Sequence, residues 1–212
     1  MKKNLLILDF CETLVKIQTA DDFIKFIAKK NLFRYLFLVT IYFLFFTKII
    51  TAINYIFNVN IKRKDLITFS LFNLKEHKLI IYGKQYSNNN LIKLSKESIV
   101  RKVNDFIDKK NPDLIFIITG GYSYYISSFL ENKNIKYDLI ISSILNLSDR
   151  KKVYGGLKID CMGNEKVNLL KEKINIFDYN ISLFTDDEVS DLPLINISNE
   201  VYVVKKEIIK KI

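Results

Sequence analysis

Three short apolar segments each lead into polar residues, and this feature constrains the fold of the chain more than any other. The segments and the residues that follow them are 5–8 with Asp9, 114–118 with Thr119, and 181–184 with Thr185. Runs of this length are typical of strands that are buried on both faces of a parallel sheet. Ligands bind at the carboxyl ends of such strands. We therefore expect the polar residues to share one edge of a sheet.

Helical patterns alternate with these strands. Helices are expected from Thr19 onward and over 91–109, 123–131 and 164–173, with a hairpin or turn at 154–158 and further strands over 137–144 and 201–204. This alternation indicates an α/β fold with a Rossmann-like, doubly wound parallel sheet and an inserted helical cap. The expected domains are a core of residues 1–15 and 99–212 and a cap of residues 16–98.

The composition excludes several classes of protein. Of the 212 residues, 49% are hydrophobic and 26% are charged, which is enough for a folded core and argues against disorder. The formal net charge is +10, but no compact basic run with interleaved aromatic residues indicates a nucleic-acid partner. The apolar start ends at Asp9 and is too short for a secretory segment, and Cys11 and Cys161 make no disulfide framework. We expect a cytoplasmic protein.

One region does not fit a simple cap. Residues 35–47 carry no charge, and after Lys48 a second uncharged stretch covers residues 49–61. A membrane-spanning helix needs about 20 apolar residues, and Lys48 interrupts any span of that length. Three interpretations stay open: buried cap helices, which we favour, a helix that lies against a membrane surface, and a transmembrane span. Association with a membrane surface is therefore an alternative to a purely cytoplasmic location.

Four polar features predict a site for phosphoryl transfer. They are Asp-Phe-Cys-Glu-Thr-Leu at 9–14, Thr-Gly-Gly at 119–121, Gly-Asn-Glu-Lys at 163–166, and Thr-Asp-Asp-Glu-Val-Ser-Asp at 185–191. A carboxylate can accept a phosphoryl group covalently. Mg²⁺ binds a few carboxylates together with waters and substrate phosphate, so Mg²⁺ is the expected cofactor and a small phosphorylated molecule the expected substrate.

Roles follow from the chemistry of the side chains. Asp9, Asp187 and Asp191 supply oxygen ligands of the kind that Mg²⁺ prefers. Lys166 offers a positive charge to the nucleophile and the phosphate, and Thr119 offers a hydrogen bond to a phosphoryl oxygen. The two glycines after Thr119 allow backbone amides to approach closely.

The order and spacing of these features resemble the haloacid dehalogenase superfamily, in its phosphoserine-phosphatase-like branch. Residues 9–13 resemble the first motif of the superfamily, Asp-x-Asp-x-Thr, and the second, lysine and acidic motifs of the branch correspond to residues 117–121, 161–167 and 187–194. The resemblance extends from residue 5 to about residue 204, although the cap matches only in kind.

The resemblance implies specific roles. Asp9 is expected to be the nucleophile and a metal ligand, and the backbone carbonyl of Cys11 is expected to be a second ligand. Asp187 is expected to bind the metal, and Asp191 to bind it or to support the lysine. Asp186 remains a candidate ligand, because the family tolerates two spacings. The expected phosphate-binding residues are Thr13, Thr119, Gly120 and Lys166, with Thr119, Lys166 and Cys11 counted with Asp9 as catalytic residues.

Two positions depart from the family pattern. Cys11 stands where phosphatases of this family have the Asp that protonates the leaving group, and Gln18 stands where phosphoserine phosphatases have the Glu that holds the substrate amine. The leading hypothesis is a magnesium-dependent phosphatase that acts on a small phosphorylated metabolite through an aspartyl-phosphate on Asp9. The alternative is a weakly catalytic or non-catalytic module that binds a phosphate or a lipid. Phosphoserine is disfavoured as the substrate.

Overall fold

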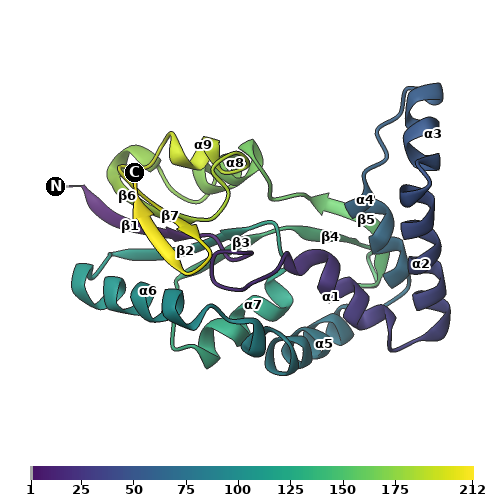
Figure 1. The fold of residues 1–212 in the computed structure, drawn as a ribbon, viewed down its shortest axis with the longest axis horizontal. Coiled ribbons are helices and arrows are strands. Elements are labelled where there is room, and N and C mark those ends of the chain that lie inside the picture. Colours follow the sequence, from purple (N-terminus) through teal and green to yellow (C-terminus); the bar gives the residue numbers. More distant parts are fainter. Residues whose placement is uncertain (1) are drawn as a thin grey trace. The chain divides into compact units, whose positions relative to one another are not determined.

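The computed structural model describes residues 2–212 and divides into two compact units (Figure 1). Unit 1 runs to Gln18 and continues with Gly83–Ser143 and Asp160–Ile212. Unit 2 contains Thr19–Tyr82 and Ile144–Ile159. Each unit therefore contains segments that are far apart in the sequence.

Unit 1 is built on a sheet that has six strands within the described residues, in the order β3-β2-β1-β6-β7-β8. The strands are β1 (Lys3–Leu8), β2 (Leu114–Thr119), β3 (Leu139–Ser142), β6 (Tyr179–Thr185), β7 (Glu200–Lys205) and β8 (Ile208–Lys211). Neighbouring strands from β3 to β7 pair in parallel, and β8 pairs antiparallel with β7 at the edge. The predicted α/β class and doubly wound sheet are confirmed. The antiparallel edge strand was not anticipated from the sequence.

Helices cover both faces of this sheet. Figure 1 shows α6 (Glu97–Lys110) and α7 (Ser123–Asn132) on one face and α8 (Asn164–Lys171) and α9 (Leu192–Ile195) on the other. Helix α6 shows why: Ile99, Val103 and Ile107 recur at helical spacing and are buried. The short 3₁₀ helices of unit 1 are η2 (Leu91–Leu94) and η3 (Ile176–Asp178).

Strand β1 lies at the centre of the sheet and fixes the edge where its neighbours end. Its residues Leu5, Leu6, Ile7 and Leu8 are all at most 1% exposed, as a strand with neighbours on both faces requires. Leu8 pairs with Ile117 of β2 and with Phe184 of β6. The residues that follow these three positions therefore emerge at the same edge of the sheet.

Unit 2 consists of helices and one hairpin. The helices are α1 (Thr19–Ala28), α2 (Leu32–Phe46), α3 (Ile49–Phe57), α4 (Arg63–Thr68) and η1 (Phe69–Leu71), and α5 (Glu76–Asn89) contains the boundary with unit 1. The hairpin is formed by β4 (Ile144–Leu147) and β5 (Val153–Ile159). It is bound to α4 by the Gly156 amide, which donates to Thr68 Oγ1 at 2.6 Å, and by the Leu157 amide, which donates to Asp65 Oδ1 at 3.1 Å.

The two units differ from the predicted domains, which were a core of residues 1–15 and 99–212 and a cap of residues 16–98. Residues 144–159 belong to unit 2, because backbone bonds to α4 hold the hairpin there. Residues 83–98 belong to unit 1. The predicted helix over 91–109 is broken before α6, because the backbone at Ser95 bridges to Val15 and the Lys96 amide donates to the Leu14 carbonyl at 2.9 Å.

The uncharged region forms helices α2 and α3, but their side chains are mostly not buried. Of the residues in α2, which the structure describes in full, Leu38 and Ile41 are buried, while Phe33 is 82% and Phe46 is 86% exposed. The interpretation as buried cap helices is therefore wrong for most of these side chains. Among the described residues no single helix is long and apolar enough to cross a bilayer, although α2 and α3, bent by 67°, meet that criterion together.

Candidate active site

The predicted residues of three motifs meet at the carboxyl edge of the central strands. Asp9 follows β1, Thr119 ends β2, and Thr185 ends β6. The Asp9 amide donates to the Phe184 carbonyl at 2.9 Å, so the first residue after β1 is still tied to β6. Asp9 is 5% exposed, and Thr119 and Thr185 are fully buried. The sheet therefore presents a carboxylate and two hydroxyl groups side by side.

Lys166 joins two carboxylates in the interior of unit 1. It lies in the first turn of α8, which follows Gly163, a residue with a φ of +55° that favours glycine. Its Nζ lies 3.0 Å from Asp9 Oδ1 and 2.6 Å from Asp191 Oδ1, and Lys166 and Asp191 are 3% and 1% exposed. Thr185 Oγ1 donates to the other oxygen, Asp191 Oδ2, at 2.6 Å. Asp191 thus holds the ammonium that holds Asp9.

The charges of this cluster change its acid–base properties. Burial raises the pKa of Asp9 to about 7, although Lys166 acts to lower it, while the carboxylates of Asp191 and Asp186 raise it further. Burial acts to lower the pKa of Lys166, but Asp9 and Asp191 outweigh it and the pKa is raised above its usual value. Lys166 is therefore charged at neutral pH, and Asp9 is a carboxylate whose negative charge is incompletely balanced.

The structure distinguishes the two neighbouring aspartates after β6. Thr13 Oγ1 lies 3.0 Å from Asp9 Oδ2 and 3.0 Å from Asp186 Oδ1, so it links these two carboxylates. Asp187 Oδ1 instead accepts hydrogen bonds from the backbone amides of its own loop, Val189 at 3.0 Å and Ser190 at 2.9 Å. The structure thus places Asp186 beside Asp9, whereas one oxygen of Asp187 is bonded within its own turn. Asp186, which the sequence left as a candidate ligand, is the aspartate linked to Asp9, and the ligand role of Asp187 stays a prediction.

Asp9 and Asp186 fit a divalent cation of the magnesium type. No three His, Cys, Asp or Glu side chains among residues 2–212 converge as a ready-made metal cage. Mg²⁺, however, commonly takes only one or two carboxylates, with waters and substrate phosphate as its other ligands. Asp9 and Asp191 share one buried ammonium, and Thr13 links Asp9 to a third carboxyl group, that of Asp186, whose pKa is raised by burial. A bound dication would balance this excess of carboxylates. Of the two roles predicted for Asp191, the contacts show the second, the support of Lys166.

The second motif is held against the lysine motif. Ser143 Oγ donates to the Gly120 carbonyl at 2.9 Å and accepts from the Cys161 amide at 3.1 Å. A Cβ atom on Gly120 would lie 2.4 Å from Met162 Sδ, so the two loops approach closely there. Thr119 Oγ1 accepts from the Gly121 amide at 3.2 Å. Ser143 carried no signal in the sequence, because its role depends on two loops that only the fold brings together.

Cys11 is buried beside Thr119. Its Sγ lies 3.6 Å from Thr119 Oγ1, a distance at which either group can donate a weak hydrogen bond. Cys11 is 6% exposed. The thiol therefore shares the edge of the sheet with the hydroxyl of Thr119.

Lys96 is a second cation that sequence reasoning missed. It is 7% exposed, and its Nζ donates to the backbone carbonyl of Glu12, a residue with a φ of +53°. Burial lowers the pKa of Lys96, while Asp186 and Glu12 oppose this change. Gln18 Nε2 donates to Glu12 Oε2 at 2.5 Å, so the carboxylate of Glu12 is engaged by Gln18. Nothing in the sequence separates Lys96 from the many other lysines.

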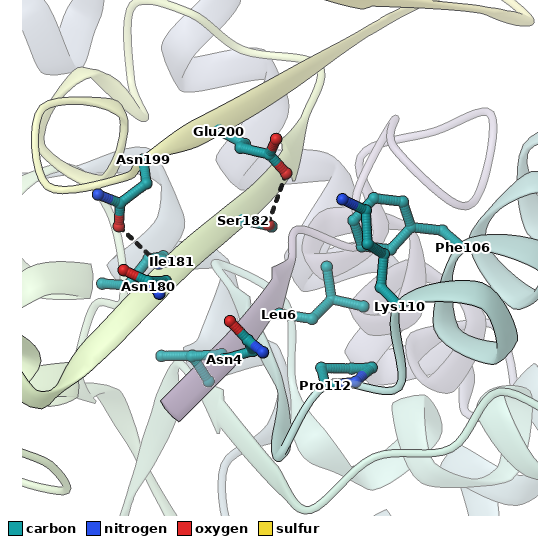
Figure 2. Close-up of a pocket in the computed structure, with 11 residues that line it drawn as sticks. Asn4, Leu6, Phe106, Lys110, Pro112, Asn180, Ile181, Ser182, Asn199 and Glu200 are labelled. Carbon is teal, nitrogen blue, oxygen red and sulfur yellow. Dashed lines mark hydrogen bonds between the residues drawn. The ribbon is translucent and has the colours of Figure 1, made fainter. Parts of the chain in front are cut away.

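A cavity of about 350 Å³ lies at the opposite end of the same strands (Figure 2). It is lined by the amino ends of β1, β6 and β7 together with residues near the end of α6, among them Asn4, Lys110, Asn180 and Glu200. Its polar groups bond one another: Ser182 Oγ donates to Glu200 Oε2 at 3.3 Å, and the Ile181 amide donates to Asn199 Oδ1 at 2.8 Å. Because ligands of α/β sheets bind at the carboxyl ends, the carboxylate cluster is the better candidate site.

Comparisons with solved structures identify the fold. The chain is similar to a protein of unknown function from Bordetella pertussis Tohama I, with a TM-score of 0.68 and 13% identity over 95% of this chain and 89% of that one. It is also similar to a phosphoserine phosphohydrolase-like protein from Francisella tularensis (TM-score 0.57, 18% identity, 97% and 88% covered) and to a substrate-bound phosphoserine phosphatase (0.55, 17%, 95% and 85%). No family model and no curated protein matches the sequence.

These structures show that the chain has the fold of phosphoserine phosphatases, the branch that the sequence motifs resemble. The likeness covers nearly the whole of the chain. At these identities it concerns the fold, and the chemistry of the site has to be argued from the residues of this chain.

The two aspartates after β6 can be separated by experiment. We expect Asp186→Asn to weaken Mg²⁺ binding about 10- to 100-fold, because it removes a carboxylate beside Asp9. Asp187→Asn is the matched control and should weaken binding far less. Isothermal titration of the purified protein with MgCl₂, without substrate, measures both. Equal losses in the two variants, or a larger loss in Asp187→Asn, would contradict the assignment.

The raised pKa of Asp9 predicts a stability effect with a definite sign. Between pH 4 and pH 7 the folded protein binds a proton on Asp9 that the unfolded chain has released, so metal-free stability falls as the pH rises through this window. Asp9→Asn should therefore raise the melting temperature at pH 8, by about 2–4 °C for each kcal/mol relieved, and by less at pH 5. Thermal unfolding in EDTA measures both values, and a lower melting temperature at pH 8 would refute the charge balance described above.

Proposed function

We propose that this chain is a magnesium-dependent hydrolase of small phosphate monoesters in which Asp9 is the nucleophile. The observation that carries the proposal is the Lys166 ammonium, which is buried and bonded at once to Asp9 and Asp191 at the carboxyl edge of the sheet. A structural ion pair needs only one carboxylate. A nucleophile that must face a phosphate needs a fixed orientation and a nearby cation, and this arrangement supplies both.

The residues of the site support a two-step reaction. In the first step an oxygen of Asp9 attacks phosphorus and the bond from phosphorus to the ester oxygen breaks. The leaving group departs as an alkoxide or aryloxide that takes a proton from water, and an aspartyl-phosphate forms. In the second step water attacks phosphorus and releases inorganic phosphate and the Asp9 carboxylate. Lys166 holds Asp9 Oδ1, and Thr13 contacts Oδ2. Thr119 and the backbone at Gly120 are proposed to bind the phosphoryl oxygens beside it.

Mg²⁺ is the proposed cofactor, held by Asp9, Asp186 and the backbone carbonyl of Cys11. When bound, it would neutralise the phosphate and lower the pKa of Asp9 so that the nucleophile is ionised. Lys96 acts to lower the pKa of Asp186, so it adds positive charge to the same region.

Cys11 limits the substrates that this site can hydrolyse well. A thiol has an ordinary pKa of about 8.5, and it is a poor substitute for the carboxyl that phosphatases of this fold place here to protonate the leaving group. Substrates with good leaving groups, such as aryl phosphates, need little of this help. The same observation favours the second candidate function, a weakly catalytic module that binds phosphate. Gln18, bonded to Glu12, has no charge to hold a substrate ammonium, which argues against phosphoserine.

Replacing the nucleophile tests the proposed function. Asp9→Asn should lower kcat for an aryl phosphate by about 10⁴-fold or more, because an amide oxygen does not form the covalent intermediate. Asp108→Asn, the same change at an exposed position of α6, should leave kcat unchanged. Steady-state hydrolysis of p-nitrophenyl phosphate with and without Mg²⁺ measures the effect. If Asp9→Asn retains wild-type turnover, Asp9 is not the nucleophile.

Restoring the missing acid separates the two candidate functions. Cys11→Asp should raise kcat about 10²- to 10⁴-fold on alkyl phosphates and much less on aryl phosphates, because only the poor leaving group needs a proton. Cys161→Ser, which removes the other buried thiol, should not produce this difference. The ratio of alkyl to aryl turnover is the readout. No gain on either substrate would mean that the site binds phosphate without being organised for hydrolysis.

A further inference from the structure

Helix α2 is apolar around its whole circumference and yet largely uncovered. The structure describes all 15 residues of this helix. Arg34 is the one charged residue among them, and Leu38 and Ile41 are the buried ones. Helices of this kind are normally buried in a protein core or in a membrane. The protein covers one narrow side, so most of the apolar side chains of α2 are left exposed.

The exposed side chains of α2 and α3 include large aromatic residues. We call this set the apolar surface. Its members that are at least 60% exposed are Leu32, Phe33, Phe43 and Phe46 of α2 and Tyr55, Ile56 and Phe57 of α3. Aromatic side chains such as these are enriched where proteins enter the boundary between lipid headgroups and hydrocarbon.

Three polar side chains on or next to these helices already have hydrogen-bond partners. Thr40 Oγ1 donates to the Leu36 carbonyl at 3.0 Å, and Thr47 Oγ1 donates to the Phe43 carbonyl at 2.9 Å. Asn54 exchanges two hydrogen bonds with the backbone of Ile61, at 3.2 and 3.0 Å. These side chains can therefore leave water without losing a hydrogen bond, which an apolar environment requires.

The charge around the apolar surface selects among possible occupants. Residues 23–64 contain eight of the chain's 33 Lys and Arg and none of its 23 Asp and Glu, so about a fifth of the chain holds eight of its ten net positive charges. Lys29 and Lys30 precede α2, Lys48 lies between α2 and α3, and Lys62 follows α3. A second copy that docked through the same surface would bring these charges against themselves. An anionic surface would attract them.

We propose that the apolar surface binds the surface of a bilayer that contains anionic lipids. The helices lie in the interface instead of crossing it, because α2 extends about 22 Å while the hydrocarbon core is about 30 Å thick. The 67° bend at Lys48 prevents α2 and α3 from forming one continuous span. The aromatic side chains enter the boundary, and the lysines contact the lipid phosphates. This proposal does not rest on the phosphatase activity, because binding needs no turnover.

Co-sedimentation with vesicles tests the apolar contribution. Wild type should sediment with vesicles of phosphatidylglycerol and phosphatidylcholine at low salt, and weakly or not at all with phosphatidylcholine alone. Phe43→Ser, Phe46→Ser and Phe57→Ser, combined in one variant, should lower the apparent affinity at least tenfold. These side chains are exposed, so circular dichroism and the melting temperature should match those of wild type.

A matched control and a charge variant complete the test. Phe177→Ser, Ile208→Ser and Ile212→Ser, three changes at exposed apolar positions of unit 1, should leave binding unchanged. Replacing the exposed Lys29, Lys48 and Lys62 by Gln should weaken binding about fivefold for each charge removed. Added salt should also weaken binding, because it screens the attraction between the lysines and the anionic lipids.

Three outcomes would overturn the proposal. The first is the absence of sedimentation with anionic vesicles at low salt. The second is an equal loss of binding in the unit 1 control, which would show that any exposed apolar residue matters. The third is a dimer, seen by analytical ultracentrifugation without lipid, that the three α2 and α3 changes abolish while vesicles bind neither protein. That result would identify a second copy of the chain as the occupant.

Discussion

The buried ammonium of Lys166, shared by Asp9 and Asp191, is the interaction on which the functional interpretation depends. Removing one partner of a buried ion pair costs about 3–5 kcal/mol when it leaves a charge uncompensated. Here the cluster has more carboxylates than ammonium groups, so Lys166 stays compensated while Asp9 does not. The fold thus holds the carboxylate of Asp9, the proposed nucleophile, with unbalanced charge at the edge of its sheet, and such a group is suited to meeting a cation and a phosphate.

The sequence was sufficient for the core of the fold. Leu5 to Leu8, and the apolar segments before Thr119 and Thr185, could be recognised as strands because a strand buried on both faces needs a continuous apolar run. Unit 2 was less predictable. The hairpin at 144–159 joins α4 through backbone amides that bond Thr68 and Asp65, and hydrogen bonds between residues about 90 positions apart leave no periodic signal. The exposure of α2 was not the favoured interpretation, because an apolar sequence is compatible both with a buried helix and with a helix that is left uncovered.

The residues of the site also separate into those that the sequence identified and those that only the fold revealed. Asp9, Thr119 and Lys166 were identified because each follows or begins an element that the sequence shows, and the structure brings them to one edge. The choice between Asp186 and Asp187 required the turn geometry, in which amides of the loop occupy the carboxylate of Asp187. Lys96, Ser143 and Thr185 act through contacts with other loops, and residues of these types are common throughout the chain. Local patterns therefore locate the carboxylate of the proposed nucleophile, and the fold determines its neighbours.

The most direct test of the central claim is a crystal structure of the protein with Mg²⁺ and beryllium fluoride, a mimic of a phosphoryl group bound to a carboxylate. The account predicts beryllium bonded to an oxygen of Asp9, with Lys166 Nζ still between Asp9 and Asp191 and the cation in contact with Asp9 and Asp186. An adduct on any other carboxylate, or a Lys166 side chain directed away from Asp9, would contradict it.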